Sequence, residues 1–223
     1  MVEEDSASRV AAAPYTWPFL TVYDLWVIRL SNQCAWRCDA RVMLGLYRDH
    51  LGDRHLEVGP GSGWYLANSG RQFDGEMVLM DLNPVPLAYT RRRLEKVGCV
   101  VNAVAGSVLD PVPEAAGSRF DSIGLNFVMH CVPGSFAEKG VAFEHLARVL
   151  SDDGVLFGST ILGHRSRTVF GRALSAVYTR VGAFNNGRDD REGLEEALGA
   201  AFRTFSVAEV GDVTLFTARS PRR

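Results

Sequence analysis

The stretch His55-Leu-Glu-Val-Gly-Pro-Gly-Ser-Gly-Trp-Tyr-Leu66 decides the fold of this chain. An apolar run reaches an acid, Glu57, and then breaks into three alternating glycines, Gly59, Gly61 and Gly63. Glycine tolerates unusual φ angles and has no Cβ that would hold a ligand away from the backbone. The aromatic and apolar residues after the glycines indicate the first turns of a helix. The pattern therefore predicts the strand–loop–helix corner at which a doubly wound sheet binds its ligand.

The spacing of the glycines separates two classes of cofactor site. The dinucleotide fingerprint G-x-G-x-x-G needs a third glycine where the helix packs on the strand. Counting from Gly59 that position is Trp64, and counting from Gly61 it is Leu66, so the fingerprint fails in both registers. The series acid-x-Gly-x-Gly-x-Gly instead resembles the first motif of class I S-adenosylmethionine (SAM)-dependent methyltransferases. A glycine-rich turn that binds nothing is the alternative, and four constrained positions in one stretch argue against it.

Length and composition indicate one globular domain. The chain has 223 residues, of which 47% are hydrophobic and 22% charged, and its net charge is −2. This length fits a single α/β domain, and the small charge gives no electrostatic reason to expect nucleic acid or an anionic membrane as a partner. The four cysteines lack the spacing of zinc ligands, so we expect buried, reduced thiols and no metal site; they are Cys34, Cys38, Cys99 and Cys131.

The N-terminal residues differ in composition from the rest of the chain. The acidic, polar start MVEEDSASRV lacks the apolar core of a signal peptide, and no apolar run approaches membrane-spanning length, which favours a cytoplasmic protein. We expect residues 1–13 to be disordered, residues 14–51 to form a helical lid segment rich in aromatic side chains, and residues 52–223 to form the core of one domain. No large dimerisation segment is evident, which favours a monomer.

Apolar runs that end in polar residues predict the strands of a parallel sheet, alternating with helices. The expected strands are 55–58, 77–81, 99–104, 120–126 and 154–163, and the expected helices are 37–51, a helix from 64, 84–98, 135–150, 166–181 and 190–201. Asp81 falls 20 residues after Gly61, where such folds place a carboxylate at a strand tip to accept two ribose hydroxyls.

The C-terminal residues predict an antiparallel hairpin. Residues 205–210 and 213–218 are separated only by Gly211-Asp212, and strands joined by so short a connection must be antiparallel neighbours. A parallel sheet finished in this way is a second likeness to class I methyltransferases. The resemblance implies an α/β, Rossmann-like, doubly wound sheet of seven strands, mostly parallel with an antiparallel C-terminal hairpin.

From residue 15 onward the chain resembles methyltransferases that act on small molecules in bacterial and fungal specialised metabolism or quinone pathways. It implies SAM as cofactor, S-adenosylhomocysteine as product, and a small, aromatic or apolar acceptor. The three glycines would hold the methionine part of SAM, Glu57 would brace that loop, and Asn126 would lie beside the sulfonium. The remaining positions that the resemblance assigns to the ribose and adenine are Asp81, Leu82, Asn83, Gly106, Ser107 and Val108.

One adenine position departs from the family pattern. Many relatives carry Asp after the glycine of the third strand, where this chain has Ser107. The serine hydroxyl can accept the same hydrogen bond from the adenine amino group, the amide of Val108 could serve the ring, and Asp110 is a possible substitute.

Two histidines follow strands on the side where the methyl group would be presented. His130 comes after the fourth strand and His164 after the fifth, and either could act as a base or orient the acceptor, since histidine titrates near neutral pH. Ordinary packing is the alternative for both. Tyr15, Trp36 and Tyr178 are candidates for the lid and the acceptor pocket, with plain packing again the alternative; Phe184 and Asn185 could line the same pocket.

Methyl transfer from a sulfonium is an in-line displacement that needs alignment and exclusion of water but no metal. The leading hypothesis is thus a metal-independent methyltransferase for a small metabolite. A SAM-binding protein that does not methylate, such as a regulator, is the alternative. A nucleotide-linked oxidoreductase is a third possibility, which Trp64 disfavours.

Overall fold

The computed structural model describes residues 34–71, 75–163 and 166–223. These residues form one seven-stranded sheet in the order β3-β2-β1-β4-β5-β7-β6. Pairings among β1 to β5 are parallel, whereas β7 is antiparallel to both β5 and β6. The strands are β1 (Arg54–Val58), β2 (Glu76–Asp81), β3 (Val101–Ala105), β4 (Phe120–Asn126), β5 (Leu150–Thr160), β6 (Phe202–Val210) and β7 (Val213–Pro221). The expected doubly wound sheet with its antiparallel C-terminal hairpin is confirmed.

The strand order creates a switch point between β1 and β4. From β1 the chain runs outward to β2 and β3, and then returns to the other side of β1 to add β4 and β5. The connections on the two sides of this point lead away from each other, and open α/β sheets bind their ligands beyond the carboxyl ends of the strands at such a point. The glycine-rich stretch follows β1 directly, which places it at this switch point.

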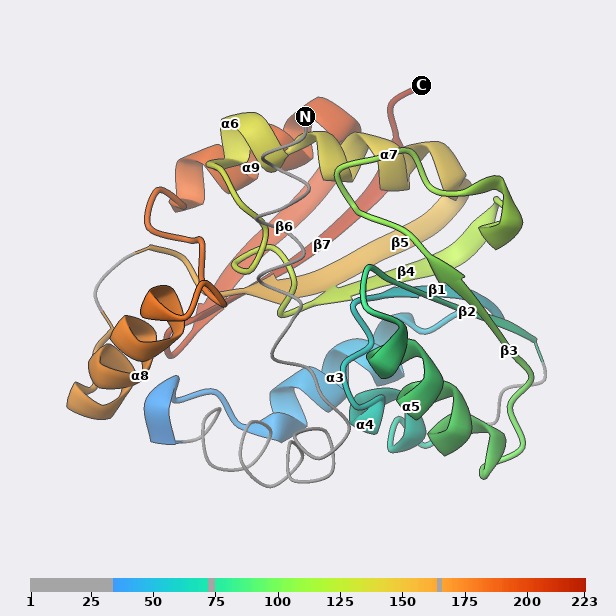
Figure 1. The fold of residues 1–223 in the computed structure, drawn as a ribbon. Helices are drawn as coiled ribbons and strands as arrows, with labels where there is room; N and C mark the ends of the chain where they lie inside the picture. Colours follow the sequence, from blue (N-terminus) through green and yellow to red (C-terminus); the bar gives the residue numbers. More distant parts are fainter. Residues whose placement is uncertain (1–33, 72–74, 164–165) are drawn as a thin grey trace.

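Helices cover both faces of the sheet (Figure 1). Helices α3, α4 and α5 lie against one face, and α6, α7 and α9 lie against the other, while α8 stands off to one side. Their bounds are α3 (Ala40–His50), α4 (Trp64–Ala67), α5 (Pro84–Glu95), α6 (Phe136–Lys139), α7 (Val141–Val149), α8 (Val169–Arg180) and α9 (Arg191–Ala201), with a 3-10 turn at Glu114–Ala116. None of the helices in the described ranges is long and apolar enough to cross a bilayer.

The strand β2 shows how the sequence fills the two layers. Its side chains alternate between faces, so Met77 and Leu79 pack in the cluster with α3, α4 and α5, while Val78 and Met80 pack in the cluster with α6, α7 and α9. All four are fully buried. This burial on both faces explains why the central strands are continuous apolar runs.

Several element bounds differ from the sequence predictions. The helix expected over 135–150 is two helices separated at Gly140, where α9 approaches so closely that a Cβ would lie 2.7 Å from the Cβ of Ala197. Strand β5 begins at Leu150 rather than residue 154 because it continues past an irregularity in its pairing with β4, and it ends at Thr160 rather than residue 163. The third strand begins at Val101, two residues later than expected.

Two further expectations concern side chains and the lid. Cys34 is exposed, so the prediction of buried thiols is wrong for that residue. Helix α3 belongs to the segment predicted as a lid, and its Tyr47 packs in the cluster beneath the sheet. Residues 14–33 lie outside the described ranges, so the lid itself stays a prediction.

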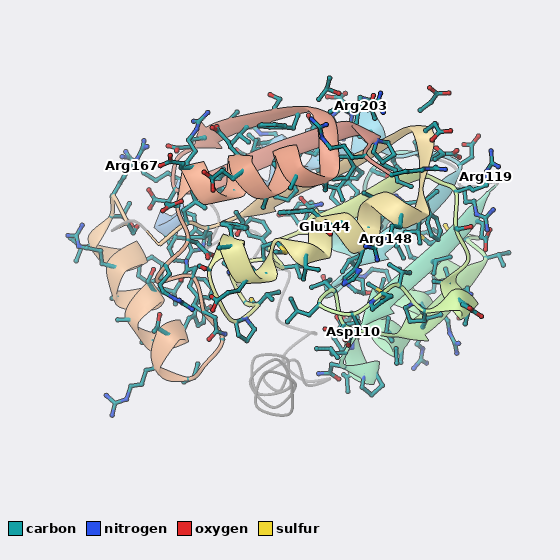
Figure 2. The ribbon with its side chains drawn as sticks, turned by 90° about the horizontal axis from the view of Figure 1, so that it is seen from above. Asp110, Arg119, Glu144, Arg148, Arg167 and Arg203 are labelled. Atoms are coloured by element: carbon teal, nitrogen blue, oxygen red, sulfur yellow. The ribbon has the colours of Figure 1, made fainter. Side chains whose placement is uncertain are left out.

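The labelled arginines in Figure 2 are distributed over the molecule. They come from the residue before β4, from α7, from the segment before α8 and from β6, and are Arg119, Arg148, Arg167 and Arg203. These four do not form one basic patch (Figure 2).

Candidate functional site

The residues predicted to bind a cofactor lie at one edge of the sheet. The amide of Gly59 donates to the carbonyl of Met80 at 2.9 Å, and the amide of Gly106 donates to the carbonyl of Asp81 at 3.1 Å. These bonds join the ends of β1, β2 and β3 side by side. Glu57 pairs with Gly124, which brings the end of β4 next to the same loop. The parallel register therefore brings the predicted groups together.

The glycine loop has the backbone conformation that its sequence predicts. Gly59, Gly61 and Gly63 have φ angles of +64°, +53° and +68°, in the left-handed region that side chains disfavour. At Gly63 a Cβ would also come within 2.5 Å of Thr90. The missing Cβ at Gly63 therefore lets the loop lie close to α5.

Asp81 lies at the tip of β2 and is partly buried. Its Oδ1 accepts a hydrogen bond from the amide of Asn83 at 2.8 Å. Burial raises the pKa of this carboxyl from 3.8 to about 6, although hydrogen bonds from the backbone of Asn83 and Leu82 act in the opposite direction. An acid that is costly to ionise at a strand tip is a candidate ligand-binding group.

The two residues after Asp81 have different surroundings. The side chain of Asn83 caps α5 by accepting a hydrogen bond from Val85 N at 2.9 Å, so its amide has a structural role. Leu82 is partly buried beside it. Both occupy the bend between β2 and α5, where the resemblance expects the adenine to pass.

The segment after β3 carries the residues predicted to contact adenine. Ser107 Oγ accepts a hydrogen bond from the amide of Leu109 at 3.1 Å and so closes a local turn. Val108 is buried in the core cluster. Asp110 is exposed and lies on the loop after β3, where Figure 2 labels it. Burial lowers the pKa of His145 on α7, and the charge of Asp110 acts in the opposite direction. Ser107 is the first residue with a polar side chain after the end of β3.

Glu57 and Asn126 are joined through a tyrosine that the sequence analysis did not assign to the site. Glu57 is 2% exposed, and its Oε1 accepts a hydrogen bond from the hydroxyl of Tyr47 at 2.7 Å. The same hydroxyl oxygen accepts from Asn126 Nδ2 at 3.1 Å. The Glu57 carboxylate is therefore hydrogen-bonded to a buried protein side chain. Of Glu57, Tyr47 and Asn126, it is Asn126 that lies at the tip of its strand.

Phe127, directly after Asn126, has a φ angle of +56°. Its amide donates to the carbonyl of Ser159 on β5 at 2.9 Å. A bulky residue in the left-handed region is strained, and such residues concentrate at functional sites. The chain turns sharply here and leads into the segment that carries His130.

His130 is 4% exposed. Burial, and secondarily the charge of Lys139, lowers the pKa of its imidazole to about 3. Its Nδ1 is buried and has no hydrogen-bond partner within the described residues. The ring is therefore neutral at physiological pH and holds an unused polar atom. A buried polar atom of this kind needs an explanation, and a role in binding a ligand is one.

Aromatic side chains gather around His130, with Phe184 at the centre. The ring of Phe184 lies 4.6 Å from that of His130, 5.0 Å from Tyr178 and 5.9 Å from Trp36, between centroids. The segment after α8 is fixed to the segment after β4, since the amide of Asn185 donates to the carbonyl of His130 at 2.7 Å. Three predicted residues, His130, Trp36 and Tyr178, are thus brought together beside the end of β4.

A buried ion pair supports this region and was not anticipated. Lys139 Nζ lies 2.7 Å from Asp189 Oδ2, and both side chains are fully buried. The ammonium also donates to the carbonyls of Met129 and Val132 at 2.8 and 3.1 Å. Lys139 thereby holds both ends of the turn that contains His130. Nothing in the sequence marks this lysine, because its partner is 50 residues away.

Two predicted residues cannot be placed. Tyr15 and His164 lie outside the described residues. Within the described ranges, no group of three or more His, Cys, Asp or Glu side chains is arranged to hold a metal ion.

The described groups fit the chemistry of SAM. A loop with three glycines can bring its backbone close to the methionine part, and a carboxylate at a strand tip can accept from ribose hydroxyls. Asn126 Oδ1 is buried without a partner among the described residues, and an amide oxygen accepts hydrogen bonds from a cationic ammonium.

Comparisons with known proteins identify a family, curated relatives and solved structures to which the chain is similar. The profile of the family described as "Methyltransferase domain" matches residues 56–158. The physcion biosynthesis cluster O-methyltransferase of Aspergillus chevalieri is 36% identical over 91% of both chains. The demethylluteothin O-methyltransferase of Streptomyces thioluteus is 36% identical over 92% of this chain and 89% of its own. The solved DhpI–SAH complex has a TM-score of 0.66 at 17% identity, covering 97% of this chain and 98% of the other.

Proposed function

The chain belongs to the class I small-molecule methyltransferases, and on that premise we propose that it transfers a methyl group from SAM to a hydroxyl oxygen of a small, aromatic or otherwise apolar metabolite. The observation that carries the proposal is the row of groups at one sheet edge: the glycine loop, Asp81 and Asn126 stand beside an aromatic cluster around His130. The choice of oxygen rests on the two relatives, both of which are named O-methyltransferases.

SAM, when bound, supplies a methyl group on a positively charged sulfur, and its departure leaves a neutral thioether. The chain therefore has two tasks, to align the acceptor oxygen with the methyl group and to exclude water. The glycine loop and Asp81 would fix the cofactor on the β1–β2 side of the switch point. The aromatic rings around Phe184 would cover an apolar acceptor on the β4 side.

His130 has the properties of a group that orients the acceptor. Because burial keeps its imidazole neutral, Nδ1 can accept a hydrogen bond from the acceptor hydroxyl. With SAM and an acceptor bound, Nδ1 would hold the acceptor hydroxyl in place and would receive its proton when the methyl group is transferred to the oxygen. Such positioned proton transfer contributes about 10²-fold or more to a rate.

The direct test is a turnover assay with SAM and a panel of phenols and other apolar alcohols. We expect S-adenosylhomocysteine to form in proportion to a product heavier by one methylene unit. The matched control is Asp81→Ala, which should weaken SAM binding and so reduce both products. A SAM-binding protein that does not methylate would bind the cofactor yet give no acceptor-dependent product with any panel member, and that result would overturn the proposal.

A further inference from the structure

A chain of buried hydrogen bonds runs from the start of β1 to the tip of β4. Ser122 Oγ lies 2.7 Å from His55 Nδ1, and His55 Nε2 lies 2.9 Å from Glu57 Oε2. Glu57 Oε1 then accepts from Tyr47, and the Tyr47 oxygen accepts from Asn126. All five side chains are buried, with exposures of at most 7%. A polar chain of this length inside the sheet is costly unless every member is satisfied.

The strand register builds the chain. His55 stands opposite Ser122, and Glu57 stands opposite Gly124. Residues two apart on a strand share a face, so the alternating positions of β1 and β4 stack their polar groups on one side. Gly124 is required there because a Cβ at this position would overlap Glu57 Oε2. One step further along the same face of β4 is Asn126.

The direction of each hydrogen bond follows from the fixed donors and acceptors. The carboxylate of Glu57 only accepts, so Tyr47 and His55 Nε2 must both donate to it. In the neutral His55 tautomer with its proton on Nε2, Nδ1 accepts from the Ser122 hydroxyl, whose oxygen also accepts from the backbone amide of Gly52 at 2.8 Å.

The orientation of the Asn126 amide follows from this. The Tyr47 oxygen has no second proton to offer, and it can only accept from Asn126, which fixes Nδ2 toward Tyr47. Oδ1 is therefore fixed on the other side, where it is buried without a partner within the described residues. Asn126 is the last residue of β4, two residues beyond Gly124, which pairs with Glu57 just before the glycine loop. An unsatisfied acceptor in that place selects a hydrogen-bond donor as its ligand.

We propose that Asn126 Oδ1 binds the α-ammonium group of the methionine part of SAM, and that Tyr47, Glu57, His55 and Ser122 form a positioning chain that holds this oxygen in place. The inference rests on the proposed function, since it needs SAM to be the ligand. It assigns to Tyr47 a role in cofactor affinity although its hydroxyl contacts only protein groups among the described residues. Tyr47 is in this sense a positioning residue rather than a catalytic one.

The test compares three ligands by calorimetry on wild-type protein, Tyr47→Phe and Asn126→Ala. S-adenosylhomocysteine carries the ammonium, its deaminated analogue lacks only that group, and 5′-methylthioadenosine lacks the whole amino-acid part. We expect either substitution to weaken S-adenosylhomocysteine by about tenfold or more, since hydrogen bonds to charged groups are the strong ones. Binding of the other two ligands should change less than about twofold, because neither has the ammonium.

The double variant Tyr47→Phe/Asn126→Ala shows whether the tyrosine acts through the asparagine. If it does, the double variant binds S-adenosylhomocysteine no more weakly than Asn126→Ala alone. Thr214→Val is the matched control, because it deletes another buried hydroxyl, one without a partner in the described ranges, and it should leave all three affinities unchanged. Circular dichroism confirms that each variant is folded before titration.

The outcomes separate the inference from the function on which it rests. Equal losses for S-adenosylhomocysteine and 5′-methylthioadenosine would assign Tyr47 a general structural role and overturn the inference. An unchanged affinity for S-adenosylhomocysteine in Tyr47→Phe would do the same. Failure of the wild-type protein to bind any of the three ligands would instead overturn the proposed function.

Discussion

Replacing Asp81 by asparagine should make the unliganded protein more stable and lower its affinity for SAM. Burial raises the pKa of the Asp81 carboxyl from 3.8 to about 6, which costs the folded, ionised protein about 3 kcal/mol at neutral pH. Asparagine removes this cost and keeps an oxygen that can accept from the amide of Asn83, as Asp81 does at 2.8 Å. Asp81→Asn should therefore raise the free energy of unfolding by up to about 3 kcal/mol, and the melting temperature by about 2–4 °C for each kcal/mol.

The raised pKa of Asp81 determines how the stability gain of Asp81→Asn depends on pH. The pKa of Asp81 is higher in the folded state than in the unfolded state, so its contribution to stability is present below about pH 4 and is lost as the pH rises through about 6. The gain of Asp81→Asn should thus be largest at pH 7.5 and fall below about 1 kcal/mol at pH 4.

Urea denaturation at the two pH values, without ligand, measures this gain directly. The control is Asp53→Asn, at an aspartate whose side chain is 87% exposed, and it should change the free energy of unfolding by less than about 0.5 kcal/mol. Titration with SAM should show weaker binding for Asp81→Asn. A variant that is less stable than wild type at pH 7.5, or equally stabilised at both pH values, would refute the reasoning.

Three further substitutions test the rest of the site. His130→Ala should reduce turnover by about 10²-fold in a steady-state assay with SAM affinity unchanged; undiminished turnover would remove His130 from the reaction. Lys139→Met should lower the free energy of unfolding in urea by about 3–5 kcal/mol, because it leaves a buried carboxylate without its partner; a loss under about 1 kcal/mol would contradict this. Gly63→Ala combines a φ of +68° with a contact of 2.5 Å to Thr90 and should weaken SAM binding in calorimetry, whereas Gly70→Ala, at +77° with nothing within 4 Å, should not.

The sheet could be predicted from local pattern because each of its determinants is local. Apolar runs identified the strands, the spacing of Gly59, Gly61 and Gly63 identified the loop, and the short Gly211–Asp212 connection identified the hairpin. Asp81 followed from its distance along the chain. Each of these signals lies within about 20 residues, so no knowledge of the tertiary contacts was needed.

The supporting groups could not be predicted because they depend on contacts between distant segments. Lys139 meets Asp189 only after α9 packs against α6, and Tyr47 meets Asn126 only after α3 packs on the sheet. His55 and Glu57 are two residues apart and so share a strand face, but the sequence analysis assigned no role to His55, because its partner at Ser122 depends on the register of β4. The close approach of α9 to Gly140, which the absence of a Cβ allows, likewise cannot be read from the helical periodicity of residues 135–150.

We propose above that the sheet edge formed by the glycine loop, Asp81 and Asn126 binds SAM. The first experiment is calorimetric titration of the purified protein with SAM, S-adenosylhomocysteine and NADH, side by side. We expect micromolar binding of both adenosyl compounds with one site per chain and no binding of NADH. A folded sample that fails to bind SAM, or that binds NADH in its place, would contradict it.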